Sequence, residues 1–268
     1  MSNSTAPTDI TLRSNSSSWW ISNDGQSVVI ADQSTASYDT YLLRTGAAPV
    51  HLGPGSPTGV SPDGRLVLAV PVDGYPLLLH PTGPGSSRQL PDPENIVFKF
   101  AVWLDNTHVI GFGQKLGQPS RGYVQDINGG PPRPFTKDGE TVDAPRWWSI
   151  PVSPDATRVV GVDEQGTPMV YRISDGTSEP LGHVRPQDIP VQWTPDGRGL
   201  LVAHGFGSPW VVERLDLATG ARTPAATIRA HDPAGLRLSI FAISRDAKYY
   251  EHTYSRLLSD LYVVEGLK

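Results

Sequence analysis

The sequence predicts an all-β protein, a six-bladed β-propeller of four-stranded antiparallel blades, and three observations lead to this prediction. One turn phrase recurs six times along the 268 residues. Short apolar strands flank the copies, and no window of about eleven residues shows convincing helical periodicity. The chain also holds 27 Gly and 26 Pro residues, which suit the many tight turns of such a fold.

The repeated phrase reads S-P-D-G followed by an apolar strand. The clearest copies are SPDGRLVLAV, SPDATRVVGV and TPDGRGLLVA, and the more divergent ones are SNDGQSVVIA, WLDNTHVIGF and SRDAKYYEHT. The aspartates that anchor the six copies are Asp24, Asp63, Asp105, Asp155, Asp196 and Asp246. Their successive spacings of 39, 42, 50, 41 and 50 residues lie in or just beyond the range of about 40–50 that is typical of four-stranded propeller blades.

The chemistry of the phrase predicts a strand, a tight turn and a second strand. Pro sets the backbone angle of the second turn position, Asp tolerates the third, and Gly takes the left-handed fourth position. A type I turn followed by such a Gly joins two strands of a hairpin. Ala156 and Ala247 replace the Gly, so we expect backbone strain at both.

The remaining strands follow each turn in order. The clearest units predict second, third and fourth strands at 65–71, 75–83 and 86–91, then at 158–163, 168–176 and 178–182, and then at 199–205, 210–220 and 221–228. Five of the third strands end in a glycine turn, at Gly46, Gly83, Gly129, Gly176 and Gly220.

The two ends of the chain predict how the ring closes. The sixth unit supplies strands at 238–244, 249–255 and 259–267 and lacks a fourth. The N-terminal segment DITLR (9–13) is a spare strand. Pairing it with the strand around 261–264 would complete the sixth blade and remove an open sheet edge. Residues 1–268 are therefore expected to form one propeller domain.

Composition and charge exclude several classes of protein. The net charge is -5, without a cluster of Lys and Arg, so no nucleic-acid partner is expected. The absence of Cys excludes disulfides and thiolate sites but does not fix the compartment. The polar N-terminus is not a signal peptide, and no apolar stretch is long enough to insert into a membrane, which predicts a soluble chain. A chain cut from a longer, anchored protein would be extracytoplasmic, and the oligomeric state stays open.

The sequence holds no recognisable catalytic or metal-binding motif. It has no G-x-S-x-G elbow, and its seven His show neither H-x-H nor H-E-x-x-H spacing. The chain itself is therefore predicted not to be an enzyme and to use no cofactor or transition metal, although calcium held by carbonyls stays open. Two alternatives remain: a propeller enzyme, lactonase-like or another hydrolase, with its site in the central channel, and a protein-docking scaffold.

The strand before each turn is expected to line the channel. Residues three and five positions before the anchor aspartates are almost all apolar and should pack between blades, whereas those four and six positions before share the channel face. Most residues on that face are small, and the exceptions are Trp20, Lys99, Ser149 and Gln192. Two positions further out, at the mouth of the channel, stand Trp147 and Asp188. These six residues form the predicted ligand site. Lys99 and Asp188 could instead pair with each other. Loops at 113–120, 137–146 and 204–209 should surround the mouth.

The S-P-D-G phrase with its following strand resembles that of TolB-type propellers, relatives of WD-repeat proteins, over essentially the whole chain. The tail YYEHTYSRLLSDLYVVEGLK (249–268) resembles the end of propellers that follow the kinase domain in some bacterial serine/threonine kinases. This resemblance implies a non-catalytic sensor or interaction module with a small-molecule or protein ligand. The chain contains no H-R-D or D-F-G motif, so no kinase residue is carried over.

Overall fold

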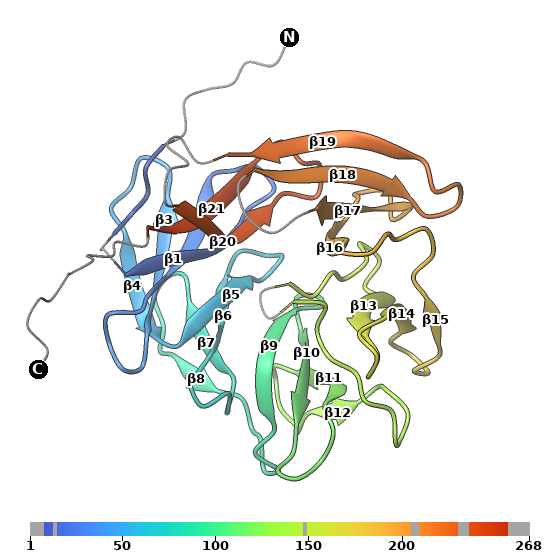
Figure 1. Cartoon of the computed structure of the whole chain (residues 1–268). Coiled ribbons are helices and arrows are strands. Elements are labelled where there is room, and N and C mark those ends of the chain that lie inside the picture. The colour runs from blue at the N-terminus through green and yellow to red at the C-terminus, as the bar shows by residue number, and fades with distance from the viewer. Residues whose placement is uncertain (1–7, 13–14, 147–148, 205–208, 230–235, 257–268) are drawn as a thin grey trace, which may run out of the picture.

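The computed structural model describes residues 8–12, 15–146, 149–204, 209–229 and 236–256, and for 236–240 and 256 it describes the backbone only. The described strands are paired antiparallel and form sheets arranged around a common centre (Figure 1). In each sheet, consecutive strands are neighbours, and the first strand lies nearest the centre (Figure 1). This confirms the predicted all-β propeller of antiparallel blades.

The strand bounds follow the repeat. The first two blades consist of β1 (Ser16–Ile21), β2 (Ser27–Asp32), β3 (Asp39–Arg44) and β4 (Val50–Pro54), and of β5 (Ser56–Val60), β6 (Leu66–Val70), β7 (Leu78–Pro81) and β8 (Arg88–Gln89). The third consists of β9 (Val97–Trp103), β10 (His108–Gln114), β11 (Arg121–Asp126) and β12 (Arg133–Pro134). The fourth and fifth consist of β13 (Arg158–Val162), β14 (Pro168–Arg172) and β15 (Ser178–Pro180), and of β16 (Ile189–Trp193), β17 (Gly199–His204), β18 (Trp210–Asp216) and β19 (Arg222–Ile228).

Among the described residues, the structure has five blades of three or four strands, not the six four-stranded blades that the repeat predicts. The sixth repeat contributes only the two-stranded sheet of β20 (Leu236–Ile243) and β21 (Tyr250–Arg256). Its predicted third strand, 259–267, lies outside the described residues. Among the described residues, the fourth blade has no inner strand, and two isolated bridges join β13 to earlier residues, Val152 to Val159 and Asp143 to Val162. Pro151 has no N–H with which to extend a ladder.

The predicted closing strand does not form among the described residues. Residues 8–12 belong to no strand, and the partner predicted around 261–264 lies outside the described part of the chain. The Asp9 carboxylate accepts a hydrogen bond from the backbone N–H of Thr11 at 2.9 Å. Such a local bond competes with strand pairing for the same donor.

The anchor aspartates hold the turns by a shared set of hydrogen bonds. In the second blade, the Ser61 hydroxyl donates to Asp63 Oδ1 at 2.6 Å, and the same oxygen accepts the Arg65 N–H at 3.1 Å. The hydroxyl bond is the largest of the causes that lower the pKa of its aspartate in four turns, those of Asp24, Asp63, Asp155 and Asp196. Partial burial opposes such bonds at Asp246, but donors from Lys248 and Ser244 outweigh it and lower its pKa to about 2.

The expected strain at the two turn alanines is present, since Ala156 and Ala247 have φ of 57° and 60°. We therefore expect Ala156→Gly to raise the free energy of unfolding. The left-handed conformation costs a non-glycine residue about 1–2 kcal/mol, and the greater backbone freedom of Gly offsets about 0.5–1 kcal/mol of that gain. Thermal unfolding checks this, with a rise in Tm of about 2–4 °C for each kcal/mol.

Gly64→Ala is the matched control for this prediction. Gly64 holds the same turn position with φ of 77°, and no atom lies within 4 Å of the place its Cβ would take. The change therefore introduces no clash, and the strain of a left-handed Ala should lower Tm by more than the reduced backbone freedom of Ala raises it. A lower Tm for Ala156→Gly would contradict the account.

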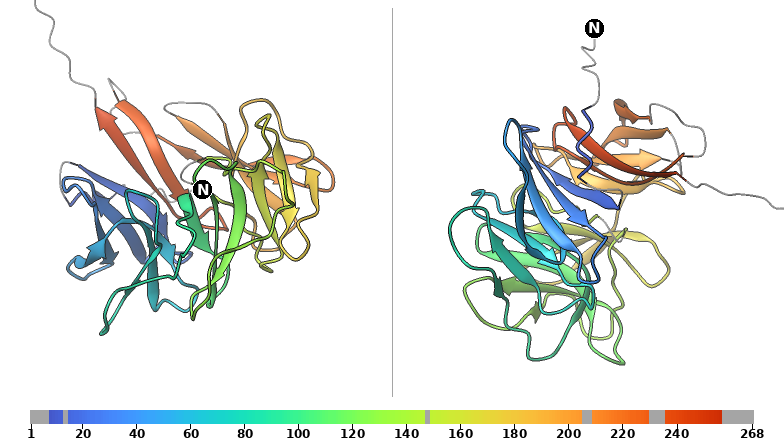
Figure 2. Two further views of the ribbon diagram at one scale, coloured as in Figure 1. Left: turned by 90° about the horizontal axis from the view of Figure 1, so that it is seen from below. Right: turned by 90° about the vertical axis from the view of Figure 1, so that its left-hand side faces the viewer.

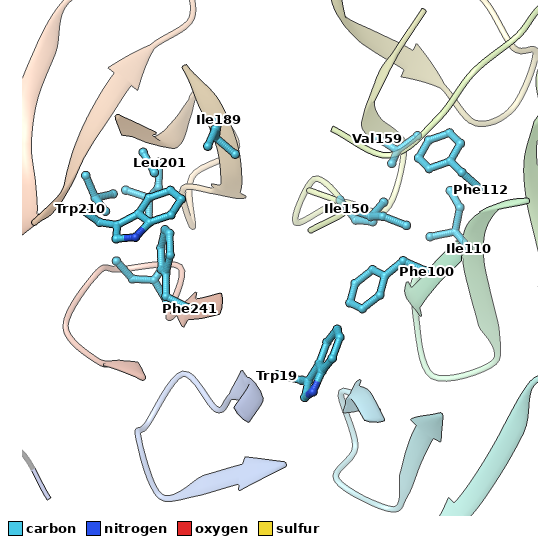
Figure 3. Packing of buried hydrophobic residues seen from close by; sticks show 14 of the residues in the cluster. Trp19, Phe100, Ile110, Phe112, Ile150, Val159, Ile189, Leu201, Trp210 and Phe241 are labelled. Carbon is cyan, nitrogen blue, oxygen red and sulfur yellow. The ribbon is translucent and has the colours of Figure 1, made fainter. Parts of the chain in front are cut away.

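The core joins the repeats around the centre. Trp19 stacks on Phe100 with ring centroids 5.9 Å apart, and Trp210 lies against Phe241 at 5.1 Å (Figure 3). One buried cluster includes residues of the first, third, fourth, fifth and sixth repeats. Side chains from distant parts of the chain thus enclose the centre of the ring.

The first blade lies beside the two-stranded sheet of the sixth repeat (Figures 1 and 2). The Ser18 N–H donates to Thr253 Oγ1 at 2.9 Å, and the Ser18 hydroxyl donates to the carboxyl group of Glu251. Burial raises the pKa of Glu251 well above its ordinary value. A carboxyl group that favours its neutral form therefore lies at the junction of the first and last described sheets. The described part of the chain contains no helix that is long and apolar enough to cross a bilayer.

Candidate functional site

A cavity of about 390 Å³ lies among the inner strands of the propeller. Much of its wall is aromatic, formed in part by Trp19, Trp20, Phe100, Trp103 and Phe241. Its polar lining includes Asn23, Ser149, Gln192 and Arg245. Aromatic surface together with a few polar groups is the usual character of a small-molecule site.

β-Bulges in the inner strands shape this wall. The pairing of β1 with β2 shifts between Ser18 and Trp20, and the pairing of β5 with β6 and of β16 with β17 shifts at the equivalent place. A bulge inserts one extra residue and breaks the alternation of side chains. Of the residues five positions before the anchor, which are expected to pack between blades, Trp19, Thr58 and Val191 also line the cavity.

The structure brings together three of the six predicted site residues. Trp20, Ser149 and Gln192 all line the cavity. The Ser149 hydroxyl donates to the Val191 carbonyl at 3.2 Å, and Gln192 Oε1 accepts the N–H of Trp193 at 3.1 Å. Trp147 lies outside the described residues. The role of these residues in ligand binding stays a prediction.

Lys99 and Asp188 do not line the cavity, and they do not pair with each other. Lys99 is the extra residue of a bulge between β9 and β10 and forms an ion pair with Asp143. Asp188, directly before β16, is paired with Arg222 of the same blade. The bulge redirects Lys99, and a cation 34 residues further along the chain draws Asp188 away from the channel.

Asp188 belongs to a network of charged side chains in the fifth blade. Its Oδ2 lies 2.5 Å from Arg222 Nη2, and its Oδ1 lies 2.7 Å from His204 Nδ1. Glu213 Oε2 lies 2.6 Å from His204 Nε2 and 3.1 Å from Arg222 Nη1. The side chains of Asp188 and Arg222 are 1% and 7% exposed, so this blade-5 network is largely shielded from water.

The charges of the network stabilise each other. Burial raises the pKa of Glu213, but bonds from Arg222 and His204 outweigh it and hold that pKa below its usual value. Burial lowers the pKa of Arg222, and the bonds to Asp188 and Glu213 more than reverse this. Within the described ranges, no group of three or more His, Asp or Glu side chains is placed to hold a metal ion.

The sequence reasoning missed Arg245, which also lines the cavity. It stands directly before the anchor Asp246. Asn23, Pro62, Leu104 and Pro154 occupy the same position in other repeats and line the cavity too. The sequence reasoning compared residues three or more positions before each anchor aspartate. A comparison of the residues directly before the anchors would have found Arg245 as the one charged side chain at that position.

No protein-family model and no curated protein sequence matches the chain. Among solved structures, a protein from Agrobacterium tumefaciens named as a TolB is similar with a TM-score of 0.61 and 16% identity, over 89% of this chain and 90% of that one. TolB from Acinetobacter baumannii is similar with a TM-score of 0.60 and 15% identity, over 87% of this chain and 65% of that one.

Enzymes share this fold as well. An oligogalacturonate lyase in complex with manganese is similar with a TM-score of 0.55 and 14% identity, over 91% of this chain and 78% of that one. A puromycin-hydrolysing peptidase from Mycobacterium tuberculosis is similar with a TM-score of 0.54 and 17% identity, over 82% of this chain and 39% of that one.

The prediction that the chain is not an enzyme rested on absent motifs, and it is corrected by these two structures, because enzymes of only 14% and 17% sequence identity share the fold. At such low identity the similarities concern the fold alone. Together with the blade arrangement, they show that the chain has a β-propeller fold similar to that of TolB.

Proposed function

We propose that the chain is a recognition propeller that binds a small molecule in its central cavity. The observation that carries this proposal is the cavity of about 390 Å³ at the centre of the ring, where aromatic side chains stand beside a few polar ones. Its volume falls within the range of about 300–1,000 Å³ that is common for ligand pockets.

The form of the wall supports binding. Trp20 offers a broad ring surface to the cavity, and Gln192 offers an amide N–H group in the same lining. The bulges supply side chains that a regular strand would turn away. Inner strands from several blades fix these groups, so the cavity is preformed, which lowers the entropy loss on binding.

A fragment screen with two variants tests the proposal. We expect some fragments to raise Tm and to give ligand-observed NMR signals with the wild type, and Trp20→Leu and Gln192→Ala to weaken them, because each change removes cavity wall. The matched control is Leu116→Ala, since Leu116 is 99% exposed on the loop between β10 and β11. Fragments that bind both cavity variants as well as the control would place the site elsewhere and contradict the proposal.

A narrower version of this proposal concerns the role of the propeller in a larger protein. A sensor role beside a bacterial serine/threonine kinase rests on the resemblance of the tail alone, and residues 257–268 of that tail lie outside the described part. The solved structures named above give this role no support.

Catalysis in the same cavity is the second candidate function, and it is favoured by the lyase and the peptidase that share the fold. Incubation with oligogalacturonate and with puromycin, followed by chromatography, tests it. Catalysis in the cavity is supported if the wild type and Leu116→Ala form product at the same rate and Trp20→Leu forms none. Unchanged compounds would contradict an activity like that of either enzyme.

A further inference from the structure

Arg245 is a cation in the cavity wall that has no anionic partner among the described residues. One guanidinium nitrogen, Nη1, donates to the Val152 carbonyl at 3.1 Å, while the backbone N–H donates to Asn23 Oδ1 at 3.1 Å. A guanidinium group has five N–H donors. Among the described residues no carboxylate lies within ion-pair distance of it, and the neighbouring Asp246 is paired with Lys248 at 3.0 Å. Several donors of Arg245 are therefore available to a ligand.

The surroundings of Arg245 leave its charge poorly compensated. Burial lowers the pKa of its guanidinium group, and no carboxylate in the described part of the chain opposes that effect. The group stays charged at every ordinary pH. A partly buried cation loses hydration without gaining an ion pair, which is unfavourable. An anion that enters the cavity would restore the missing interaction.

The amide side chains of the wall also present donors, whereas the Ser149 hydroxyl, which donates to the Val191 carbonyl, keeps acceptor capacity. Gln192 Oε1 and Asn23 Oδ1 already accept backbone N–H groups, so the amide N–H donors of both side chains remain. The indole N–H of Trp103 donates to the Gly59 carbonyl at 3.1 Å, whereas that of Trp20 donates to none of the described residues. A ligand that matches Arg245 and these amide donors carries hydrogen-bond acceptors and negative charge.

We propose that the cavity selects a small organic anion, a carboxylate on a flat apolar body, with Arg245 as its anchoring cation. The carboxylate accepts from the guanidinium group, a pairing that planar Arg groups make well. The apolar body lies against the aromatic part of the wall formed by Trp20, Trp103 and Phe241. This inference rests on the proposed function, because it names the class of ligand for the same cavity.

The test uses aromatic carboxylates such as benzoate and phenylacetate, each paired with its neutral primary amide. Calorimetry and ligand-observed NMR measure their affinities for the wild type, for Arg245→Gln and for the control Arg65→Gln, whose parent side chain is 84% exposed. We expect carboxylates to bind the wild type and the control at least about tenfold more tightly than their amides, as a charged hydrogen bond implies. Arg245→Gln should abolish this preference and leave amide affinity unchanged.

The remaining outcomes separate the two proposals. Equal affinity of carboxylates and amides for the wild type would overturn the anion inference and leave the proposed function standing. The same conclusion follows if neither the carboxylates nor the amides bind, while other fragments bind the wild type and Trp20→Leu abolishes their binding. If no fragment binds in the cavity, both proposals fall. A thermal melt of Arg245→Gln shows that the variant is folded, and we expect its Tm to be no lower than that of the wild type.

Discussion

Asp188→Asn is expected to lower the free energy of unfolding by about 3–5 kcal/mol, the usual effect of removing one partner of a buried ion pair. The Asp188 side chain is 1% exposed and contacts both Arg222 and His204. Its loss leaves the guanidinium of Arg222, which is 7% exposed, with Glu213 as its only carboxylate partner in the blade-5 network. The carboxyl group of Glu213 alone does not replace the lost charge.

Chemical denaturation of the wild type and the variant measures this effect. Arg65→Ala is the control, because it breaks an ion pair with Asp63 in which the arginine side chain is 84% exposed, and such pairs contribute about 0–1 kcal/mol. The double variant Asp188→Asn/Arg222→Met should be more stable than the sum of the single effects, since it removes both charges. If Asp188→Asn unfolds like Arg65→Ala, the network does not stabilise the fifth blade.

Glu251→Gln is expected to raise Tm at pH 8 and to have little effect at pH 4. The Glu251 side chain is buried, and its Oε1 has no hydrogen-bond partner among the described residues. Burial raises the folded-state pKa well above the ordinary value, so the native protein keeps a proton that the unfolded chain releases near pH 4. Stability from this group is complete below that pH and declines as pH rises, by up to about 1.4 kcal/mol per pH unit.

Melting curves from pH 4 to pH 9 test the prediction. The amide of Gln is neutral throughout and has the same shape, so the variant should lack the alkaline decline. Glu179→Gln is the control, because Glu179 lies exposed on β15. Equal alkaline slopes in the wild type and Glu251→Gln would show that the carboxyl group at the junction of the first and last sheets does not titrate with folding.

Local chemistry made much of the fold predictable. The S-P-D-G phrase determines a strand, a turn and a strand within about ten residues, and the left-handed position at Ala156 follows from the same phrase. The number of blades was less accessible. It depends on whether the last repeat and the N-terminal segment pair, and the bond from Thr11 to Asp9 is a local competitor that periodicity does not reveal.

The site was harder to predict because its geometry depends on bulges and distant partners. Strict alternation placed Trp20 and Gln192 correctly at the cavity but placed Trp19 away from it, since nothing in the sequence marks the extra residue of a bulge. Asp188 has the residue type of a ligand, yet its charge is taken up by Arg222, which belongs to the last strand of the same blade.

The anchor aspartates make the ring sensitive to acid as a whole. All six have a lowered pKa, so their stabilising bonds are present above about pH 4 and are lost as pH falls through the folded values, which reach about 2 at Asp246. Because every repeat carries an equivalent carboxylate in its turn, protonation removes equivalent hydrogen bonds from all six repeats as the pH falls. Acid is therefore expected to open the ring in a single concerted transition, not blade by blade.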